Sequence, residues 1–290
     1  MAASKKLSEK ELDTINVGIF GHIDHGKTTL LQRLSGKWAD THSEELKRGI
    51  TIKLGYADVT IYDDNGKVNI QGKGKPIRHV SFIDCPGHEM LMATTLSGAA
   101  IIDLAILVVA ANEGILSQTR EHLMALKAKR VEQYIVVQNK IDLVSKERAL
   151  DNYKEIVKLL DENGIKADIV PVCAQQGVNV DKVLELIAQA KVPERDTSEP
   201  AIFLVARSFD VNKPGTTPEN LRGAVLGGSL KKGTLSVGDE IEIKPGRVEM
   251  VEGQKKYISL KTKIRGLFKG STKVEKLSPG GSVAIETSLD

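Results

Sequence analysis

The chain has 290 residues, of which 41% are hydrophobic and 27% charged, and these fractions are ordinary for a soluble globular protein with room for two domains. Its two cysteines, Cys85 and Cys173, lack C-x-x-C spacing, which argues against a disulfide framework or a zinc ribbon. The sequence contains neither the apolar core of a signal peptide nor a run of roughly 18 apolar residues, so we expect a cytoplasmic protein without a membrane partner. The net charge of +3 is uneven, since residues 201–290 carry 15 basic and 10 acidic side chains; a solvated surface is the default explanation and a nucleic-acid face the alternative.

Strand-like and helix-like segments alternate through residues 17–190. The expected strands are 17–20, 80–83, 104–110, 134–138 and 169–173, and the expected helices are 27–34, 90–99, 120–128, 150–160 and 180–190. This alternation predicts an α/β fold, with a mostly parallel sheet and helices on both faces. Because Ile101 to Ala111 is almost continuously apolar, we expect a strand there that is buried on both faces. Ligands then bind at the carboxyl ends of the strands.

The chain contains one clear hairpin signal and one domain boundary. Asp63 to Gly66 predicts a tight turn between strands 59–62 and 68–70, and residues 71–76 resemble a flexible connection. From Lys191 to Pro200 the pattern lapses into polar residues and proline. Strands predominate afterwards, at 201–208, 223–230, 240–244, 256–267 and 282–286. We therefore expect a polar tail over residues 1–14, a first domain over 15–198 and a β-barrel over 199–290.

A nine-residue run, Gly21 to Thr29, separates the first strand from the first helix and has the pattern G-x-x-x-x-G-K-T. In such a phosphate loop, glycines let successive backbone N–H groups point at anionic oxygens, and the positive end of the following helix adds to them. Lys27 is expected to reach the outer phosphates, and Thr28 to bind Mg²⁺ through its hydroxyl. The alternative is an ordinary glycine-containing turn. The pattern predicts a nucleoside triphosphate without specifying the base.

Two further motifs follow later strands. Asp84 ends one strand and can hold a water bound to Mg²⁺, while the N–H of Gly87 can meet a γ-phosphate. Asn139-Lys140-Ile141-Asp142 ends another, where the Asp142 carboxylate can accept both N–H groups of a guanine edge and Asn139 can contact its O6/N7 side. Adenine would leave these groups unpaired, so the motif favours GTP over ATP. Cys173, Ala174 and Gln175 end the next strand and are expected to close over the base.

A switch segment is expected between the phosphate loop and Asp84. Thr51, within Arg48 to Ile52, can give a second hydroxyl to Mg²⁺ when the γ-phosphate is present, and loss of that phosphate would release the segment. His88 has an unperturbed pKa of about 6.5 and can orient or polarise an attacking water near neutral pH. The alternative for His88 is a polar residue at the start of a helix.

The two motifs Gly21 to Thr29 and Asp84 to His88 together resemble those of the translational GTPases, the group of elongation factor Tu. Three stretches, His42 to Asp58, Leu91 to Ala99 and Arg207 to Gly215, are similar to the gamma subunit of archaeal and eukaryotic translation initiation factor 2. This resemblance implies a P-loop GTPase domain followed by a β-barrel. It also implies a factor that carries initiator methionyl-tRNA to the small ribosomal subunit and joins alpha and beta subunits.

The same resemblance implies roles for individual residues. The phosphate site comprises Asp24, His25, Gly26, Lys27, Thr28 and Thr29. Mg²⁺ is bound by the hydroxyls of Thr28 and Thr51, and His88 is the catalytic histidine. Asp24 and the carbonyl of Gly49 are candidates for a second cation. Tyr56 matches an aromatic residue that packs against the methionine of the charged tRNA, although a tyrosine on an ordinary strand explains it equally well.

The sequence departs from the family pattern in two places. Gly66 to Arg78 contains no cysteine where family members commonly carry a zinc knuckle, so we predict GTP or GDP and Mg²⁺ as ligands but no zinc. The chain ends at Asp290, where we expect the barrel to lack its last strand and the family's third domain to be absent. We therefore expect a truncated form, a natural fragment or a divergent member, and full tRNA affinity is in doubt.

Three functional hypotheses follow. The first is a GTP switch of translation initiation with slow intrinsic hydrolysis. The second is a selenocysteine-specific or general elongation factor, which shares the nucleotide motifs. The third, from another class, is a truncated GTP-binding regulatory module that docks the factor's subunits without carrying tRNA.

Overall fold

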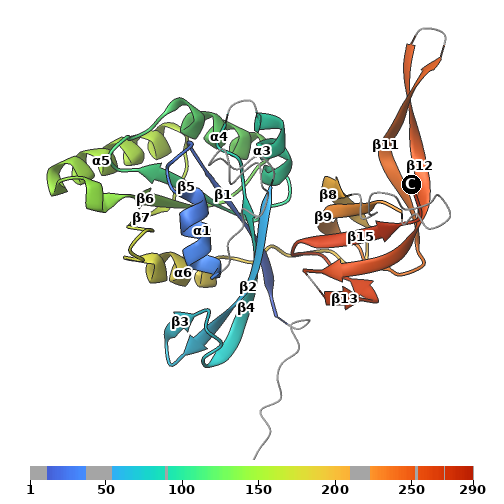
Figure 1. Ribbon diagram of the computed structural model, residues 1–290, viewed down its shortest axis with the longest axis horizontal. Coiled ribbons are helices and arrows are strands. Elements are labelled where there is room, and N and C mark those ends of the chain that lie inside the picture. The colour runs from blue at the N-terminus through green and yellow to red at the C-terminus, as the bar shows by residue number, and fades with distance from the viewer. Residues whose placement is uncertain are drawn as a thin grey trace, which may run out of the picture. The chain divides into compact units, whose positions relative to one another are not determined.

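The first part of the chain is built on a seven-stranded sheet. The computed structural model describes residues 12–36, 54–88, 91–209, 223–251, 254–270 and 272–289. The strand order is β3-β2-β4-β1-β5-β6-β7, in which β4, β1, β5, β6 and β7 are parallel and β2 and β3 form an antiparallel edge (Figure 1). The strands are β1 (Thr14–Gly21), β2 (Gly55–Asp64), β3 (Lys67–Asn69), β4 (Lys75–Asp84), β5 (Leu104–Ala110), β6 (Gln133–Asn139) and β7 (Asp168–Pro171). The predicted mostly parallel sheet is confirmed.

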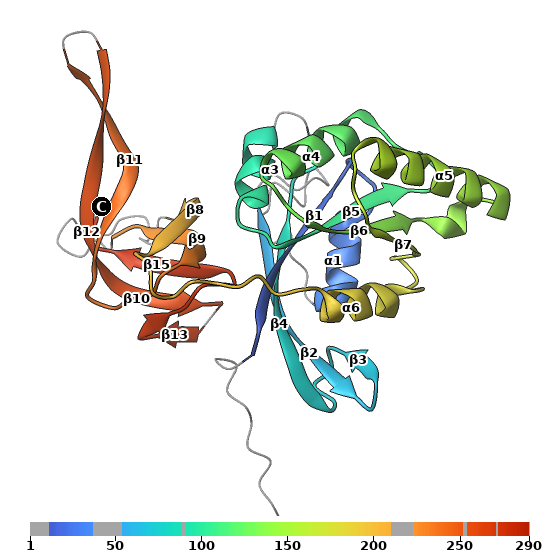
Figure 2. The ribbon, with the colours of Figure 1, turned by 180° about the vertical axis from the view of Figure 1, so that it is seen from behind.

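Helices cover both faces of this sheet (Figures 1 and 2). They are α1 (Lys27–Ser35), α3 (Met92–Ala99), α4 (Ser117–Ala128), α5 (Lys146–Glu162) and α6 (Val180–Gln189). On one face, Leu30 and Leu34 of α1 and Ile187 of α6 pack in a single cluster with alternate residues of the strands, such as Val17 and Val108. The other three helices lie on the opposite face. Every residue of β5 is buried, as the continuous apolar run predicted.

The predicted hairpin is present between β2 and β3. Asp64 pairs with Lys67, and the two turn residues Asn65 and Gly66 have φ of 54° and 84°, which suits a turn that needs left-handed backbone at both positions. The Asp63 carboxylate accepts the Gly66 N–H at 2.8 Å. The expected flexible connection over 71–76 is shorter than predicted, because β4 already begins at Lys75. The amide of Asn69 orders the intervening turn by bonding the N–H groups of Gln71 and Lys73 and the carbonyl of Lys73.

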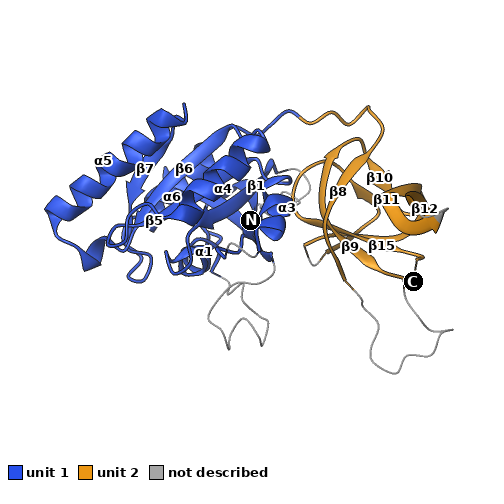
Figure 3. Cartoon of the chain, turned by 90° about the horizontal axis from the view of Figure 1, so that it is seen from above, with its two compact units in different colours: residues 1–194 blue, residues 195–290 orange. Residues whose placement is uncertain are grey.

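Residues 195–290 form a second unit, and residues 1–194 the first (Figure 3). The second unit is an antiparallel half-barrel with the strand order β11-β12-β15-β9-β8, to which β13 is added on β12, and β10 pairs separately with β14. Leu230, Leu267 and Ile285 are central to its own apolar core. The strands are β8 (Ile202–Phe209), β9 (Val225–Lys232), β10 (Leu235–Ser236), β11 (Glu240–Val251), β12 (Gln254–Lys269), β13 (Thr272–Val274), β14 (Lys276–Leu277) and β15 (Val283–Thr287).

The β11–β12 ribbon is longer than the sequence predicts. The sequence pattern predicts the first of these strands only over residues 240–244. The register between the two strands shifts between Ile243 and Arg247, and this irregularity absorbs Pro245 and Gly246 so that pairing resumes to Val251. Two hydrophobic side chains near the tip, Met250 and Tyr257, are 65% and 59% exposed.

Arg78 on β4 provides a test of how α6 is held to the sheet. Its Nη1 donates to the carbonyls of Ile187 and Ala190 at 2.8 and 2.6 Å, at the carboxyl end of α6. Arg78→Met removes both bonds and leaves these carbonyls without that donor, so we expect a loss of about 1.5–3 kcal/mol in the free energy of unfolding. Urea denaturation followed by circular dichroism measures it. Lys158→Met on α5, where the lysine is 79% exposed, is the control, and equal effects of the two variants would contradict the assignment.

Candidate nucleotide-binding site

The loop between β1 and α1 brings its backbone unusually close to neighbouring strands. Gly21 has φ of 140°, and a Cβ there would lie 2.3 Å from the carbonyl oxygen of Val108. Gly26 has φ of 89°, and a Cβ there would lie 2.3 Å from Nδ2 of Asn139. Both positions therefore require glycine. The side chain of Lys27, which begins α1, is folded back over the loop, and its Nζ donates to the carbonyl of His22 at 2.8 Å.

The segment after β4 meets this loop. The hydroxyl of Thr28 donates to Oδ2 of Asp84 at 2.8 Å, although the two residues are 56 positions apart. A Cβ on Gly87 would lie 2.6 Å from Nζ of Lys27 and 2.9 Å from the N of Ile23, so Gly87 is in direct contact with the loop. The structure thus brings together the lysine, hydroxyl, carboxylate and glycine that the sequence motifs single out.

His88 directly follows Gly87, and its carbonyl accepts the N–H of Leu91 at 2.9 Å. Its catalytic role stays a prediction. Thr51 and Gly49, the predicted Mg²⁺ and cation ligands of the switch segment, lie outside the described residues, as do Asp210 to Gly215 of the third family-like stretch.

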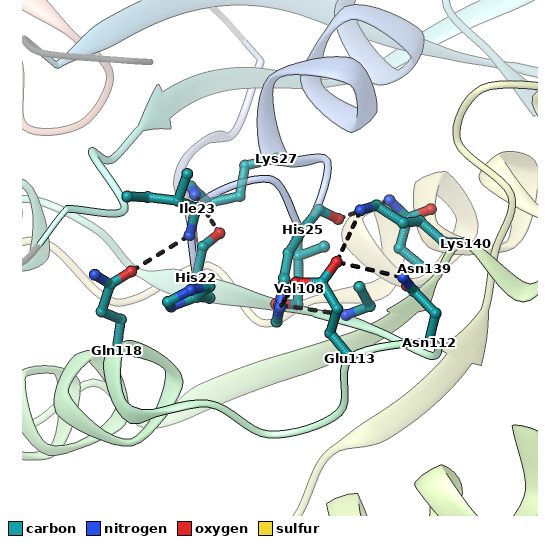
Figure 4. Close-up of polar contacts among 11 residues, drawn as sticks. His22, Ile23, His25, Lys27, Val108, Asn112, Glu113, Gln118, Asn139 and Lys140 are labelled. Carbon is teal, nitrogen blue, oxygen red and sulfur yellow. Dashed lines mark hydrogen bonds and ion pairs between the residues drawn. The ribbon is translucent and has the colours of Figure 1, made fainter. Parts of the chain in front are cut away.

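The side-chain amide of Asn139, which Figure 4 shows beside His25, joins two loops. Its Nδ2 donates to the carbonyl of His25 at 2.9 Å, and its Oδ1 accepts the N–H of Ala174 at 3.0 Å. Asn139 is only 3% exposed, so these are bonds in a water-poor setting. The amide therefore fixes the phosphate loop against the segment after β7. The predicted contact of Asn139 with the base stays a prediction.

Asp142 lies in a short 3-10 helix, η3 (Ile141–Leu143), and is exposed at the surface of the site. The left-handed backbone of Lys140, with φ of 59°, turns the chain into this helix. Close to Asp142 lies the buried thiol of Cys173, whose pKa is raised by burial and then by the Asp142 carboxylate. Asp142 and the 173–175 segment are therefore neighbours, and their predicted contact with the base stays a prediction.

Arg33 was not identified from the sequence. It projects from α1, and its Nε and Nη2 donate to the carbonyls of Ala174 and Gln175 at 3.1 and 2.5 Å. The 173–175 segment is thus held from both sides, by Asn139 and by Arg33. No spacing rule links an arginine of the first helix to a loop 141 positions later, which is why the sequence did not reveal it.

Glu113, also missed, follows β5 and lies between two motifs (Figure 4). Its Oε1 accepts from Nζ of Lys140 at 3.1 Å, and its Oε2 lies 3.7 Å from Nε2 of His25. Burial opposes ionisation of this carboxyl, but the hydrogen bond and charge of Lys140 outweigh burial, and the pKa of Glu113 is lowered. The carboxylate is therefore ionised at neutral pH.

Two histidine side chains lie beneath the phosphate loop rather than on it. The ring of His25 is fully buried, with Nδ1 3.3 Å from both the Val108 carbonyl and the Ala110 N. Nδ1 of His122 on α4 accepts the N–H of Gly21 at 3.0 Å. Burial lowers the pKa of His25 to about 4 and that of His122 to about 3, so both are neutral at physiological pH. The ring of His25 faces the protein interior, so only its backbone is available for the predicted contact with the nucleotide. That contact stays a prediction.

Tyr56, the predicted tRNA contact, lies on β2 opposite Ile83 of β4 and is half-buried. This position fits either of the two interpretations offered above. In the part of the chain that the structure describes, no group of three or more His, Cys, Asp or Glu side chains is arranged to hold a metal ion, and no helix there is long and apolar enough to cross a membrane.

Comparison with known proteins gives consistent results. The family profile of the elongation factor Tu GTP binding domain matches residues 12–193. The translation initiation factor 2 subunit gamma of Methanothermobacter thermautotrophicus is 52% identical over 97% of this chain and 72% of its own length. Its counterparts in Archaeoglobus fulgidus and Thermococcus kodakarensis are 50% and 47% identical over 98% and 100% of this chain, and 70% and 73% of their own lengths.

Two solved structures share the fold. The bacterial selenocysteine-specific elongation factor EF-Sec superposes with a TM-score of 0.75 and 28% identity, over 96% of this chain and 43% of that one. The elongation factor SelB from Methanococcus maripaludis, in complex with the GTP analogue GppNHp, gives a TM-score of 0.70 and 28% identity over 95% and 52%. The present chain thus spans about half the length of these two structures.

The buried His122 predicts a pH dependence of stability. Its pKa is about 3 in the folded protein and about 6.5 when unfolded, so between these values the unfolded state binds more protons. The free energy of unfolding therefore falls as the pH is lowered from 6.5, by up to about 1.4 kcal/mol per pH unit for this residue. We expect His122→Asn, whose amide oxygen takes the place of Nδ1 and can still accept the Gly21 N–H, to flatten this dependence between pH 6.5 and 4. Urea unfolding at a series of pH values measures the slope, and an unchanged slope would contradict the prediction.

Proposed function

Because this chain belongs to the family of translation initiation factor 2 gamma subunits and is a GTP-binding translational GTPase of the elongation factor Tu type, we propose that it binds initiator methionyl-tRNA in its GTP form and delivers it to the small ribosomal subunit. GTP hydrolysis then releases it. The observation that carries the proposal is the convergence of Lys27, Thr28, Asp84 and Gly87 on one loop, next to the segment that holds Asp142. The protein acts in the cytoplasm.

Guanine is proposed as the base because of Asp142. An exposed carboxylate beside the loop after β7 can accept the N1–H and N2–H of guanine, whereas adenine offers no such pair of donors. The Asn139 amide holds that loop in place by accepting the N–H of Ala174. A site with fixed polar groups rejects an unmatched base, since those groups would otherwise be left unpaired.

The γ-phosphate is proposed to be sensed by Gly87 and the adjacent Thr28 and Asp84. Gly87 has no side chain between its backbone and Lys27, so a phosphate oxygen held by Lys27 lies within reach of the Gly87 N–H. Loss of that phosphate removes the contact and frees the segment on which His88 lies. Nucleotide state is thereby converted into a change in the position of this segment.

The oxygen donors of Thr28 and Asp84 fit Mg²⁺, which prefers hydroxyl, carboxylate, water and phosphate ligands. When bound between these residues and the phosphates, the ion would supply a positive charge that favours the negative charge developing during hydrolysis. Asp84 is fully buried and ends a central strand, so it holds its oxygen in a fixed position without substrate. Thr51 of the switch segment is proposed as the second hydroxyl, and Asp24 with the Gly49 carbonyl as a second cation site.

Alpha and beta subunits are proposed as partners, because the relatives that are 47–52% identical are named as gamma subunits of a multi-subunit factor. Tyr56 is proposed to contact the methionine of the tRNA. The selenocysteine-specific alternative has its support in the two solved structures, yet their identity of 28% is far below that of the initiation factors. Binding of initiator methionyl-tRNA, elongator tRNA and selenocysteyl-tRNA in parallel would separate the two, and capture of the subunits without any tRNA would favour the regulatory module.

Asp142→Asn tests the base assignment. The substitution replaces one acceptor oxygen by an NH₂ donor, which clashes electrostatically with the guanine N2 group but matches the carbonyl oxygen of xanthine. We expect GTP binding to weaken by about 100-fold or more and XTP binding to improve, as measured by competition against a fluorescent nucleotide. Asp151→Asn, an exposed residue of α5, is the control. Equal loss of GTP and XTP binding would show that Asp142 has only a structural role.

His88→Ala tests the hydrolytic step. If His88 orients the attacking water, the variant keeps its affinity for GTP, while hydrolysis stimulated by ribosomes falls by about 100-fold or more. Wild-type hydrolysis without partners is expected to be slow, at about 10⁻⁴ to 10⁻² per second. Single-turnover assays with and without ribosomal subunits measure both. Fast unassisted turnover by the wild type would contradict the switch, and loss of GTP affinity in the variant would contradict the role of His88.

A further inference from the structure

Glu113 connects two parts of the nucleotide site that no backbone segment joins directly. It follows β5 in a turn closed by the N–H groups of Glu113 and Gly114, which both donate to the carbonyl of Ala110, at 3.2 and 2.8 Å. Gly114 has φ of 80°, and a Cβ there would lie 3.1 Å from a carboxylate oxygen of Glu155, so the turn is closely packed. The side chain of Glu113 therefore projects from a fixed base.

From this base the carboxylate reaches two loops at once (Figure 4). One oxygen accepts from Nζ of Lys140 at 3.1 Å, in the motif that carries Asp142, and the other lies 3.7 Å from His25 Nε2, in the phosphate loop. Asn112 adds a longer bond at 3.4 Å. About a third of the Glu113 side chain and a quarter of the Lys140 side chain are exposed, so the pair is partly withdrawn from water.

We propose that Glu113 is a positioning residue that holds Lys140, and with it the base-binding loop, at a fixed distance from the phosphate loop. The inference rests on the proposed GTP site. Lys140 lies next to Asn139 in the chain, and with its ammonium held by Glu113 its methylene stem has a defined path along the base site. In this proposal Glu113 acts on the nucleotide through Lys140, to which it is hydrogen-bonded.

The contacts of Glu113 differ from the two hydrogen bonds that the Asn139 amide makes. Asn139 bonds backbone groups of the phosphate loop and of the segment after β7. Glu113 instead accepts from the side chain of Lys140 and lies 3.7 Å from the His25 ring of the phosphate loop. The contacts of Asn139 and those of Glu113 thus both restrain the distance between the residues proposed to bind the base and those proposed to bind the phosphates. A ligand that contacts both loops binds more tightly when the loops are already held in place, because binding then costs less conformational entropy.

Dissociation of a fluorescent GDP from the full chain tests the proposal. We expect Glu113→Ala to release GDP about tenfold faster than the wild type, and Glu113→Gln, which keeps an acceptor for Lys140 but loses the charge, about threefold faster. Dissociation of IDP, which lacks the N2 amino group, should be accelerated by the same factor as dissociation of GDP, because Glu113 is not proposed to contact that group. Glu162→Ala, which removes an exposed carboxylate from α5, should change neither rate.

A double-mutant cycle with Lys140→Met separates positioning from a general loss of structure. If Glu113 acts through Lys140, Glu113→Ala has less than a twofold further effect in the Lys140→Met background. Full additivity of the two changes, or GDP release from both Glu113 variants within twofold of the wild type, overturns the proposal. If the wild-type chain fails to bind GDP in preference to ADP, the proposed function itself fails, and this outcome is distinguishable from failure of the Glu113 inference alone.

Discussion

The arrangement of the nucleotide site depends on the buried amide of Asn139. Its nitrogen donates to the phosphate loop and its oxygen accepts from the segment after β7. The amide can approach this closely because position 26 is a glycine, where a side chain would collide with it. An aspartate in place of Asn139 would lack the donor, and an alanine would leave two buried backbone groups without their partner. This one side chain thus connects the phosphate loop directly to the segment after β7.

The parallel sheet explains why such a connection is possible. The strands β1, β5, β6 and β7 are neighbours, and their carboxyl ends place the phosphate loop, the Glu113 turn, the Lys140 motif and the 173–175 segment at one edge. Long side chains then join these loops, as Arg33 and Glu113 do. Beneath them the neutral rings of His25 and His122 accept or approach backbone N–H groups of β1 and β5, so that the loop is supported without adding positive charge below it.

The sequence predicted the parts of this site that are encoded locally. The phosphate loop, Asp84, Gly87 and Asp142 each follow a strand in a recognisable pattern, and the structure places them together. Arg33 and Glu113 carry no such pattern, because they act across more than 20 positions through ordinary charged side chains. The inward orientation of His25 was not predictable either, since a glycine-rich loop does not determine which side chains face the protein. In the second unit, Pro245 and Gly246 concealed the continuation of β11, because a register shift cannot be read from composition.

Hydrogen exchange measured by mass spectrometry, with and without GDP and Mg²⁺, tests the central claim most directly. If Asn139 and Glu113 tie the loops into one unit, nucleotide binding slows exchange together in four segments. These are 21–29, 84–88, 110–114 and 139–142, and 173–176 should follow them because Asn139 binds Ala174. Protection confined to 21–29, with the segments after β5, β6 and β7 exchanging as in the free protein, would contradict the account.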